Sequence, residues 1–359
     1  MKTILLIIYI LFNNIILPQS KFNNKLTEYG VMNYPDRKSK YLQAEPKKEK
    51  MDGQKLSKLL STHTIIKTTQ QIELTKRNVI IGKRGTRITI APGTFQYSDY
   101  LTAKGAATVH LYEVIDDFDY MISGVYHIYK DSKNLSFMEL GGMLRFEIFQ
   151  GNTRLKMSGE YPILVDFPLL YPDKKFNLYY INLEGVWIKK YDYGSYDLYP
   201  VVESEEEGKK VIGVRQFKMN SQGWWGFGIP YKDMVVFKGK YQCDGKSNFS
   251  AHVFLIGENF LGYIGKWVSG GEYSISAFPG RKIRIFIADE NGNIGISPTI
   301  ESSTRIALDG FPETIDNVFE EVEKINLTKP PDEVINDRIL LQQFLQIQPV
   351  EYSIVYPTK

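Results

Sequence analysis

The stretch Leu144-Arg145-Phe146-Glu147-Ile148 alternates strictly between apolar and charged residues. Successive side chains of a β-strand point to opposite faces, so this alternation predicts a strand with one buried face. Two further segments, Arg87–Ile90 and Thr108–Leu111, follow the same period of two. Glycine and proline bound such runs, as expected of turns between strands. The pattern therefore predicts a mainly β fold.

The composition agrees with a β fold and excludes several classes of protein. The 359 residues include 24 Tyr, 20 Phe and 4 Trp, side chains that favour pleated, half-buried surfaces. The 44 Lys and Arg against 41 Asp and Glu leave a net charge of +3, which excludes a strongly basic nucleic-acid binder. A single cysteine, Cys243, can form neither an intrachain disulfide nor a cysteine-based zinc site.

Residues 1–20 have the layout of a secretory signal peptide. Lys2 precedes the apolar run Ile4–Phe12, which is shorter than the roughly 20 residues that span a bilayer. An uncleaved anchor is the alternative. No cysteine directly follows the run, so we expect no lipoprotein, and no later segment predicts a transmembrane helix. We therefore predict an exported protein (periplasmic, outer-membrane-associated or extracellular) whose mature chain starts near Lys21.

Changes in residue pattern divide the rest of the chain. Residues 21–61 are polar and rich in lysine, which predicts a largely disordered leader. We expect a first β-domain at 62–202, an acidic linker or loop at 203–210, and a second β-sandwich domain at 211–300. In the second block the turn signals recur about every ten residues, a spacing typical of a small antiparallel sandwich.

The residue pattern changes again in residues 301–359. Apolar residues between Pro312 and Ile325 recur at helical spacing, and a second amphipathic helix is predicted after Asp332. We expect these helices to pack on the β-structure, a dimer contact being the alternative. Tyr352–Tyr356 predicts a final strand. The expected fold class is mainly β: two antiparallel β-sandwich-like domains with a short α-helical C-terminal segment.

Three short motifs carry a resemblance to a known family. The segment Asn78–Phe95 resembles the pattern GTxIxIPxxAF, and Gly105–Glu113 resembles GxVxLxE. Leu140-Gly141-Gly142-Met143 resembles the GGM motif of the same family. Together these segments look like an uncharacterised family of exported β-domains from bacteria with an outer membrane.

The resemblance implies a fold for each domain. Over roughly residues 65–190 the chain is similar to the ZU-type β-sandwich of ankyrins and netrin receptors. Residues 234–298 resemble, more loosely, the transthyretin-like regulatory sandwich appended to carboxypeptidases. These modules ordinarily carry no chemistry, so the resemblance implies a protein without enzymatic activity and without a cofactor.

The residues themselves offer little catalytic chemistry. His110 and Glu113 fit the H-x-x-E spacing of zinc ligands, but residues three apart on a strand point to opposite faces. We therefore predict no metal site. The sequence lacks a G-x-S-x-G nucleophile elbow, and Cys243 has no histidine nearby in the sequence to activate it. We expect no catalytic residue.

Aromatic residues form the candidate binding surface. Trp224, Trp225 and Phe227 lie among glycines, and Tyr193 and Tyr196 belong to a second aromatic segment. Exposed rings of this kind stack on sugars or on protein partners. The alternative is that Trp224 and Trp225 lie on opposite faces of a strand, in which case one of them belongs to the core.

These observations favour a non-enzymatic structural, adhesive or scaffold protein of the bacterial cell envelope. The expected partner is an envelope protein or a glycan, and nucleic acid is not expected. A carbohydrate- or peptide-binding module that uses the aromatic residues is the first alternative. A hydrolase with unrecognised acidic residues is the second, because the spacing of catalytic carboxylates is a three-dimensional property.

Overall fold

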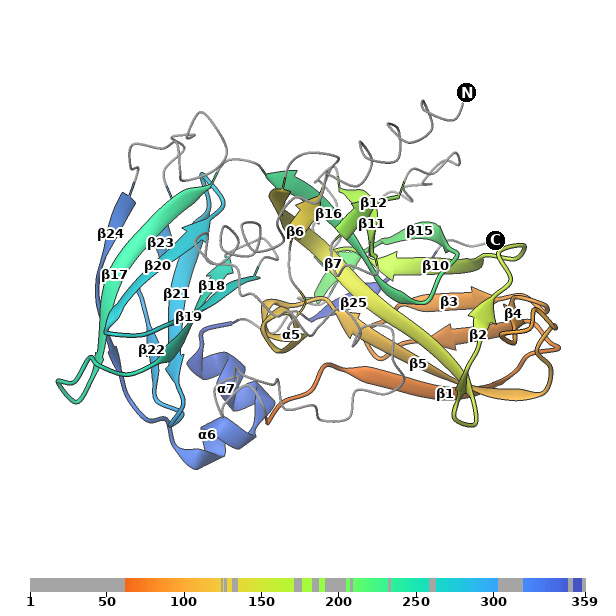
Figure 1. Ribbon diagram of the computed structural model, residues 1–359, viewed down its shortest axis with the longest axis horizontal. Helices are drawn as coiled ribbons and strands as arrows, with labels where there is room; N and C mark the ends of the chain where they lie inside the picture. The colour runs from red at the N-terminus through yellow and green to blue at the C-terminus, as the bar shows by residue number, and fades with distance from the viewer. Residues whose placement is uncertain are drawn as a thin grey trace, which may run out of the picture.

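The computed structural model in Figure 1 describes twelve segments of the chain. The predicted signal peptide at 1–20, the leader at 21–61, and Tyr193 and Tyr196 lie outside them. The described residues are 62–123, 125, 128–130, 135–170, 176–182, 187–190, 205–206, 209–231, 234–257, 263–302, 319–347 and 351–356. Within these segments no helix is long and apolar enough to cross a bilayer. The fold is mainly β with several antiparallel sheets and few helices, as the sequence predicts.

The largest sheet has eight strands and lies in the right half of Figure 1. Its order is β1 (Lys67–Glu73), β5 (Ala106–Val114), β7 (Leu135–Gln150), β16 (Gly223–Tyr231), β11 (Asn177–Ile181), β12 (Trp187–Lys189) and β6 (Ile128–Lys130), with β8 (Thr153–Arg154) paired to β7. The alternating stretches quoted from residues 108–111 and 144–148 lie in β5 and β7, at the centre of this sheet.

A four-stranded sheet packs against the large one. Its order is β15 (Val214–Met219), β10 (Ile163–Pro168), β3 (Arg87–Ile90) and β2 (Asn78–Ile81). Phe167 and Phe217 of this sheet contact the ring of Phe227 in β16, at 5.9 and 5.4 Å between centroids. A two-stranded ribbon, β4 (Phe95–Gln96) and β9 (Lys156–Met157), lies at one end. These strands form the first strand group, a sandwich with its core between two sheets.

The glycine pair of the GGM motif is a bulge in β7. Phe227 of β16 pairs with Gly142 and the next residue, Gly228, pairs with Leu140, so Gly141 has no partner on β16. Gly142 has a φ of +150°, and a Cβ added there would lie 2.5 Å from the ring of Phe167. The missing side chain thus lets a core ring lie directly against the backbone of the longest strand.

Two further sheets form a second strand group, drawn in the left half of Figure 1. One sheet has the order β20 (Glu272–Ala277), β17 (Val235–Cys243), β24 (Phe319–Leu327). The other has the order β19 (Tyr263–Val268), β18 (Ala251–Gly257), β21 (Lys282–Asp289), β22 (Ile294–Ile296), with β23 (Ile300–Glu301) paired to β21. A separate hydrophobic cluster that includes Phe237, Leu255 and Ile285 fills the space between them.

Three short helices lie where the two strand groups meet. They are α5 (Asp117–Ser123), α6 (Asp332–Asn336) and α7 (Arg338–Phe344). Ile335, Leu341 and Leu345 are buried in the hydrophobic cluster that extends from the first group, whereas Ile339 is 58% exposed. Asp337 caps α7 by accepting hydrogen bonds from the backbone N–H groups of residues 339 and 340.

The two strand groups do not divide at residues 203–210, where the sequence predicts an acidic linker or loop. This segment holds β13 (Glu205–Glu206) and the start of β14 (Lys209–Ile212), which form a hairpin. The next two strands, β15 and β16, return to the first group and pair with β10 and β7. A run of charges marks a turn equally well within a domain and between domains, because both keep it out of a core. The second strand group begins only at Val235.

The helix predicted between Pro312 and Ile325 is also wrong over its second half. Residues 303–318 lie outside the described segments, and Phe319–Leu327 form β24, which pairs in parallel with β17. Ile325 and Leu327, two residues apart in this strand, are buried. Val322 and Ile325 fit a helical spacing as well, so a short apolar pattern did not distinguish the two structures. Pairing with β17 favours the strand.

Candidate functional site

Three of the five aromatic residues of the predicted binding surface lie in the core. Trp224, Trp225 and Phe227 are 3%, 1% and 1% exposed. They belong to β16, which lies between β7 and β11 in the large sheet. The ring of Trp225 packs against Tyr180 and Phe217, at 5.6 and 5.9 Å between centroids. These three side chains are therefore unable to form a binding surface.

The loop at residues 82–86 joins β2 to β3 and contains the Gly85-Thr86 pair of the GTxI motif. The Glu113 carboxylate accepts hydrogen bonds from the backbone N–H groups of Arg84 and Thr86, at 3.0 and 2.8 Å. Glu113 is fully buried, and this burial raises the pKa of its carboxyl group although the hydrogen bonds act in the opposite direction. The two motifs that look separate in the sequence therefore meet, with Glu113 fixing the backbone of the loop.

His110 contacts different residues from Glu113. Its Nδ1 lies 3.2 Å from the hydroxyl of Thr69, and its ring lies 5.6 Å from that of Phe149. This agrees with the prediction that residues three apart on the strand face opposite ways. Among the described residues, no group of three or more His, Cys, Asp or Glu side chains is placed to hold a metal ion.

A buried ion cluster connects the 82–86 loop with two helices. We use this name for Arg84, Asp116, Asp119 and Arg338, of which the two carboxylates are buried and the two arginine side chains are 20% and 22% exposed. Asp119 of α5 is fully buried; its carboxylate lies 2.7 Å from the Arg338 guanidinium of α7 and 3.4 Å from that of Arg84. Asp116 lies 2.5 Å from Arg84 and 3.6 Å from Arg338. The guanidinium of Arg338 also lies 4.8 Å from the ring centre of Phe118.

The cluster pairs two cations with two anions, which reduces the cost of placing charges away from water. Burial, followed by the nearby charge of Asp116, raises the pKa of Asp119 to about 7, while the two arginines oppose the shift. The folded protein therefore binds this proton more tightly than the unfolded chain does. The charge of Asp119 therefore changes near neutral pH.

We expect the free energy of unfolding to fall as the pH rises from about 4 to about 7, because the unfolded chain binds fewer protons than the folded one in that window. For one proton the slope reaches about 1.4 kcal/mol per pH unit at most. Urea unfolding of the wild type and of Asp119→Asn at several pH values measures it. The variant should show a flatter profile between pH 4 and 7, and superimposable profiles would contradict the raised pKa of Asp119.

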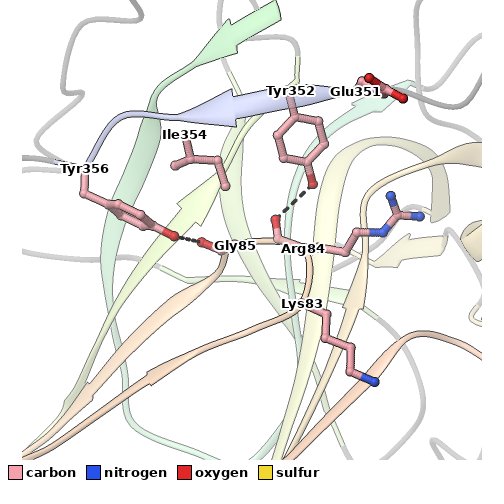
Figure 2. A pocket seen from close by; sticks show the side chains of 7 residues that line it. All are labelled: Lys83, Arg84, Gly85, Glu351, Tyr352, Ile354 and Tyr356. Carbon is pink, nitrogen blue, oxygen red and sulfur yellow. Dashed lines mark hydrogen bonds between the residues drawn. The ribbon is translucent and has the colours of Figure 1, made fainter. Parts of the chain in front are cut away.

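The C-terminal segment, residues 351–356, covers the outer side of the 82–86 loop (Figure 2). It contains β25 (Tyr352–Ile354), which pairs in parallel with β14. The hydroxyl of Tyr352 donates to the carbonyl of Arg84 at 2.9 Å, and that of Tyr356 donates to the carbonyl of Gly85 at 2.6 Å. A hollow of about 580 Å³ lies beside this contact. Its lining residues are Lys83, Arg84, Gly85, Glu351, Tyr352, Ile354 and Tyr356.

The sequence indicated parts of this site but not the site itself. Gly85, Thr86 and Glu113 appear in the quoted motifs, and a final strand near Tyr352 was expected. Arg338 and Asp119 carry no motif, and 219 residues separate them in the chain. The only signal for them was the presence of acidic residues just after β5 and of a basic residue in a helical stretch.

No protein-family model matches the chain, and no curated protein matches it.

Proposed function

We propose that the chain is a non-enzymatic, exported structural protein that acts as a scaffold in the bacterial cell envelope. The observation that carries the proposal is the way residues 319–356 join the two strand groups. The segment begins as β24 in the second group, continues through α6 and α7, and ends as β25 on the first group. In passing from one group to the other it brings Arg338 to the buried ion cluster.

Hydrophobic packing supports the same role. Phe254 and Phe286 of the second group belong to one buried cluster with Phe118 of α5 and Leu341 of α7. Phe254 and Phe286 lie 5.4 Å apart with nearly parallel rings. Two sandwiches that share a core and a buried ion cluster resist bending relative to each other, which suits a protein that holds partners at fixed positions.

The location in the envelope rests on the sequence. The signal-peptide pattern at 1–20 and the resemblance to exported β-domains of bacteria with an outer membrane both support it. Because Trp224, Trp225 and Phe227 are buried, the proposal does not use them as contacts for a glycan or a protein partner.

The test is expression of the full chain in a bacterial host with an outer membrane. We expect a mature chain that starts near Lys21 in the envelope fraction or the medium, identified by mass spectrometry. Brief treatment of the cells with an amine-reactive cross-linker should give discrete larger species that contain the chain. The control is Ile8→Arg, which places a charge in the apolar run and should leave a full-length product in the cytoplasm.

Two outcomes would count against the proposal. A full-length product that stays in the membrane would contradict export. An exported chain that forms no cross-linked species and turns over a hydrolase substrate would contradict the structural role and favour the hydrolase alternative.

A further inference from the structure

The C-terminal segment lies on the first strand group as a bound peptide does. Its backbone extends along β14, with Tyr352 opposite Lys210 and Ile354 opposite Ile212. Tyr352 and Ile354 are half-buried, whereas Ser353 between them is exposed and Val355 is 53% exposed. One extended strand added to an existing strand, with alternate side chains in contact, is the geometry of β-augmentation.

The groove under this segment recognises particular features of it. Gly85 has a φ of +88°, and a Cβ added there would overlap the Cδ1 of Ile354, so only glycine leaves room for that side chain. The adjacent carbonyls of Arg84 and Gly85 accept from hydroxyls four residues apart, those of Tyr352 and Tyr356. The groove therefore fits an extended peptide of the form Tyr-x-Ile-x-Tyr.

The contacts that keep the C-terminal segment in its groove lie at the surface of the protein. None of the residues 351–356 is buried, and three pairs of residues link β25 to β14. Local opening of such a strand costs less free energy than unfolding of the sandwich beneath it. The buried ion cluster holds α7 independently, through Arg338, so the segment can leave its groove while the helix stays in place.

We propose that this groove also binds the C-terminal segment of a second copy of the chain, so that exchanged strands connect copies. The inference rests on the proposed scaffold role and names the partner of that scaffold. An exchanged strand makes the same contacts as the original, so exchange costs little beyond association. It also brings Glu351 of one copy into the lining of the hollow to which Lys83 of the other copy belongs.

A labelled peptide with the sequence of residues 350–359 tests the groove directly. Fluorescence anisotropy measures its binding to the full wild-type chain and to the full chain carrying Tyr352→Ala and Tyr356→Ala. The double variant loses two hydrogen bonds that hold its own segment, so we expect it to bind the peptide at least about tenfold more tightly than the wild type. The same peptide with both tyrosines replaced by alanine should bind at least about tenfold more weakly than the unmodified one.

Adding Gly85→Ala to the double variant serves as the control, because its Cβ would occupy the space of Ile354. This triple variant should lose the peptide while keeping the far-ultraviolet circular dichroism of the double variant. If the double variant binds the peptide no better than the wild type, or if the triple variant binds equally well, the groove does not recognise the segment.

Sedimentation velocity of the wild type tests the exchange between copies. We expect larger species to appear as the protein concentration rises, and excess peptide should reduce them. The double variant should remain a monomer. A wild type that stays monomeric at all concentrations would overturn the exchange. Such a result would not bear on export or on cross-linking in the envelope. The proposed function is therefore tested separately, by the expression experiment described above.

Discussion

Replacing Arg338 with alanine is expected to lower the free energy of unfolding by about 3 kcal/mol at pH 8. At that pH Asp119, with a pKa of about 7, is ionised and fully buried. The variant removes its nearest cation, at 2.7 Å, and leaves Arg84 at 3.4 Å as the only other cation of the buried ion cluster. Urea unfolding followed by circular dichroism measures the change.

Two comparisons separate this effect from a general loss of surface charge. Lys240→Ala removes the ion pair with Glu272, whose two side chains are 70% and 73% exposed, and should change stability by less than about 1 kcal/mol. The cost of Arg338→Ala should also shrink at pH 5, where Asp119 binds a proton and no longer needs a counter-charge. Equal losses at pH 5 and pH 8 would show that Arg338 acts through packing alone.

Gly142→Ala is expected to destabilise the protein by about 2–4 kcal/mol. The new Cβ would lie 2.5 Å from the Cε1 and 2.7 Å from the Cζ of Phe167, a ring that is 1% exposed and also contacts Phe227. At that separation the ring or the backbone of β7 must shift to admit the methyl group. The positive φ of Gly142 adds backbone strain for any residue with a side chain. The midpoint of urea unfolding should fall accordingly.

Gly223→Ala is the matched control for Gly142→Ala. Gly223 begins β16 and has a φ of +113°, and a methyl group added there would have no other atom within 4 Å. The variant therefore reports the cost of backbone strain without the collision, which we expect to be about 1 kcal/mol. If the two variants lose equal stability, the bulge and the ring of Phe167 have no special importance.

The period-two pattern was sufficient to predict several strands of the first group. The alternation in Arg87–Ile90 and Thr108–Leu111 corresponds to β3 and β5, because each strand keeps its own face against the core. The pattern does not show whether other parts of the protein cover one face of a strand or both. Both faces of β16 are covered at Trp224 and Trp225, so these neighbouring side chains are both buried, whereas alternation alone predicts that one of them is exposed.

The candidate site depends on contacts that no local pattern contains. Gly85 and Glu113 were visible as motif residues, but the motif does not show that one fixes the loop of the other. Asp119 and Arg338 become partners only after the second strand group has placed α7 beside α5. Likewise, Phe319–Leu327 forms a strand because its backbone pairs with β17. This tertiary pairing outweighs the helical spacing of its apolar residues.

The contact between Tyr352 and Arg84 sets the order in which the molecule can be completed. The two residues are separated by 268 positions. At a synthesis rate of about 5–20 residues per second, the 82–86 loop waits on the order of ten seconds to a minute before its C-terminal partner exists. The strands of the first sandwich can therefore pair during synthesis, whereas the outer side of the 82–86 loop stays uncovered until the end of the chain has been made. A chain interrupted before Tyr352 would lack the hydrogen bonds to the carbonyls of Arg84 and Gly85.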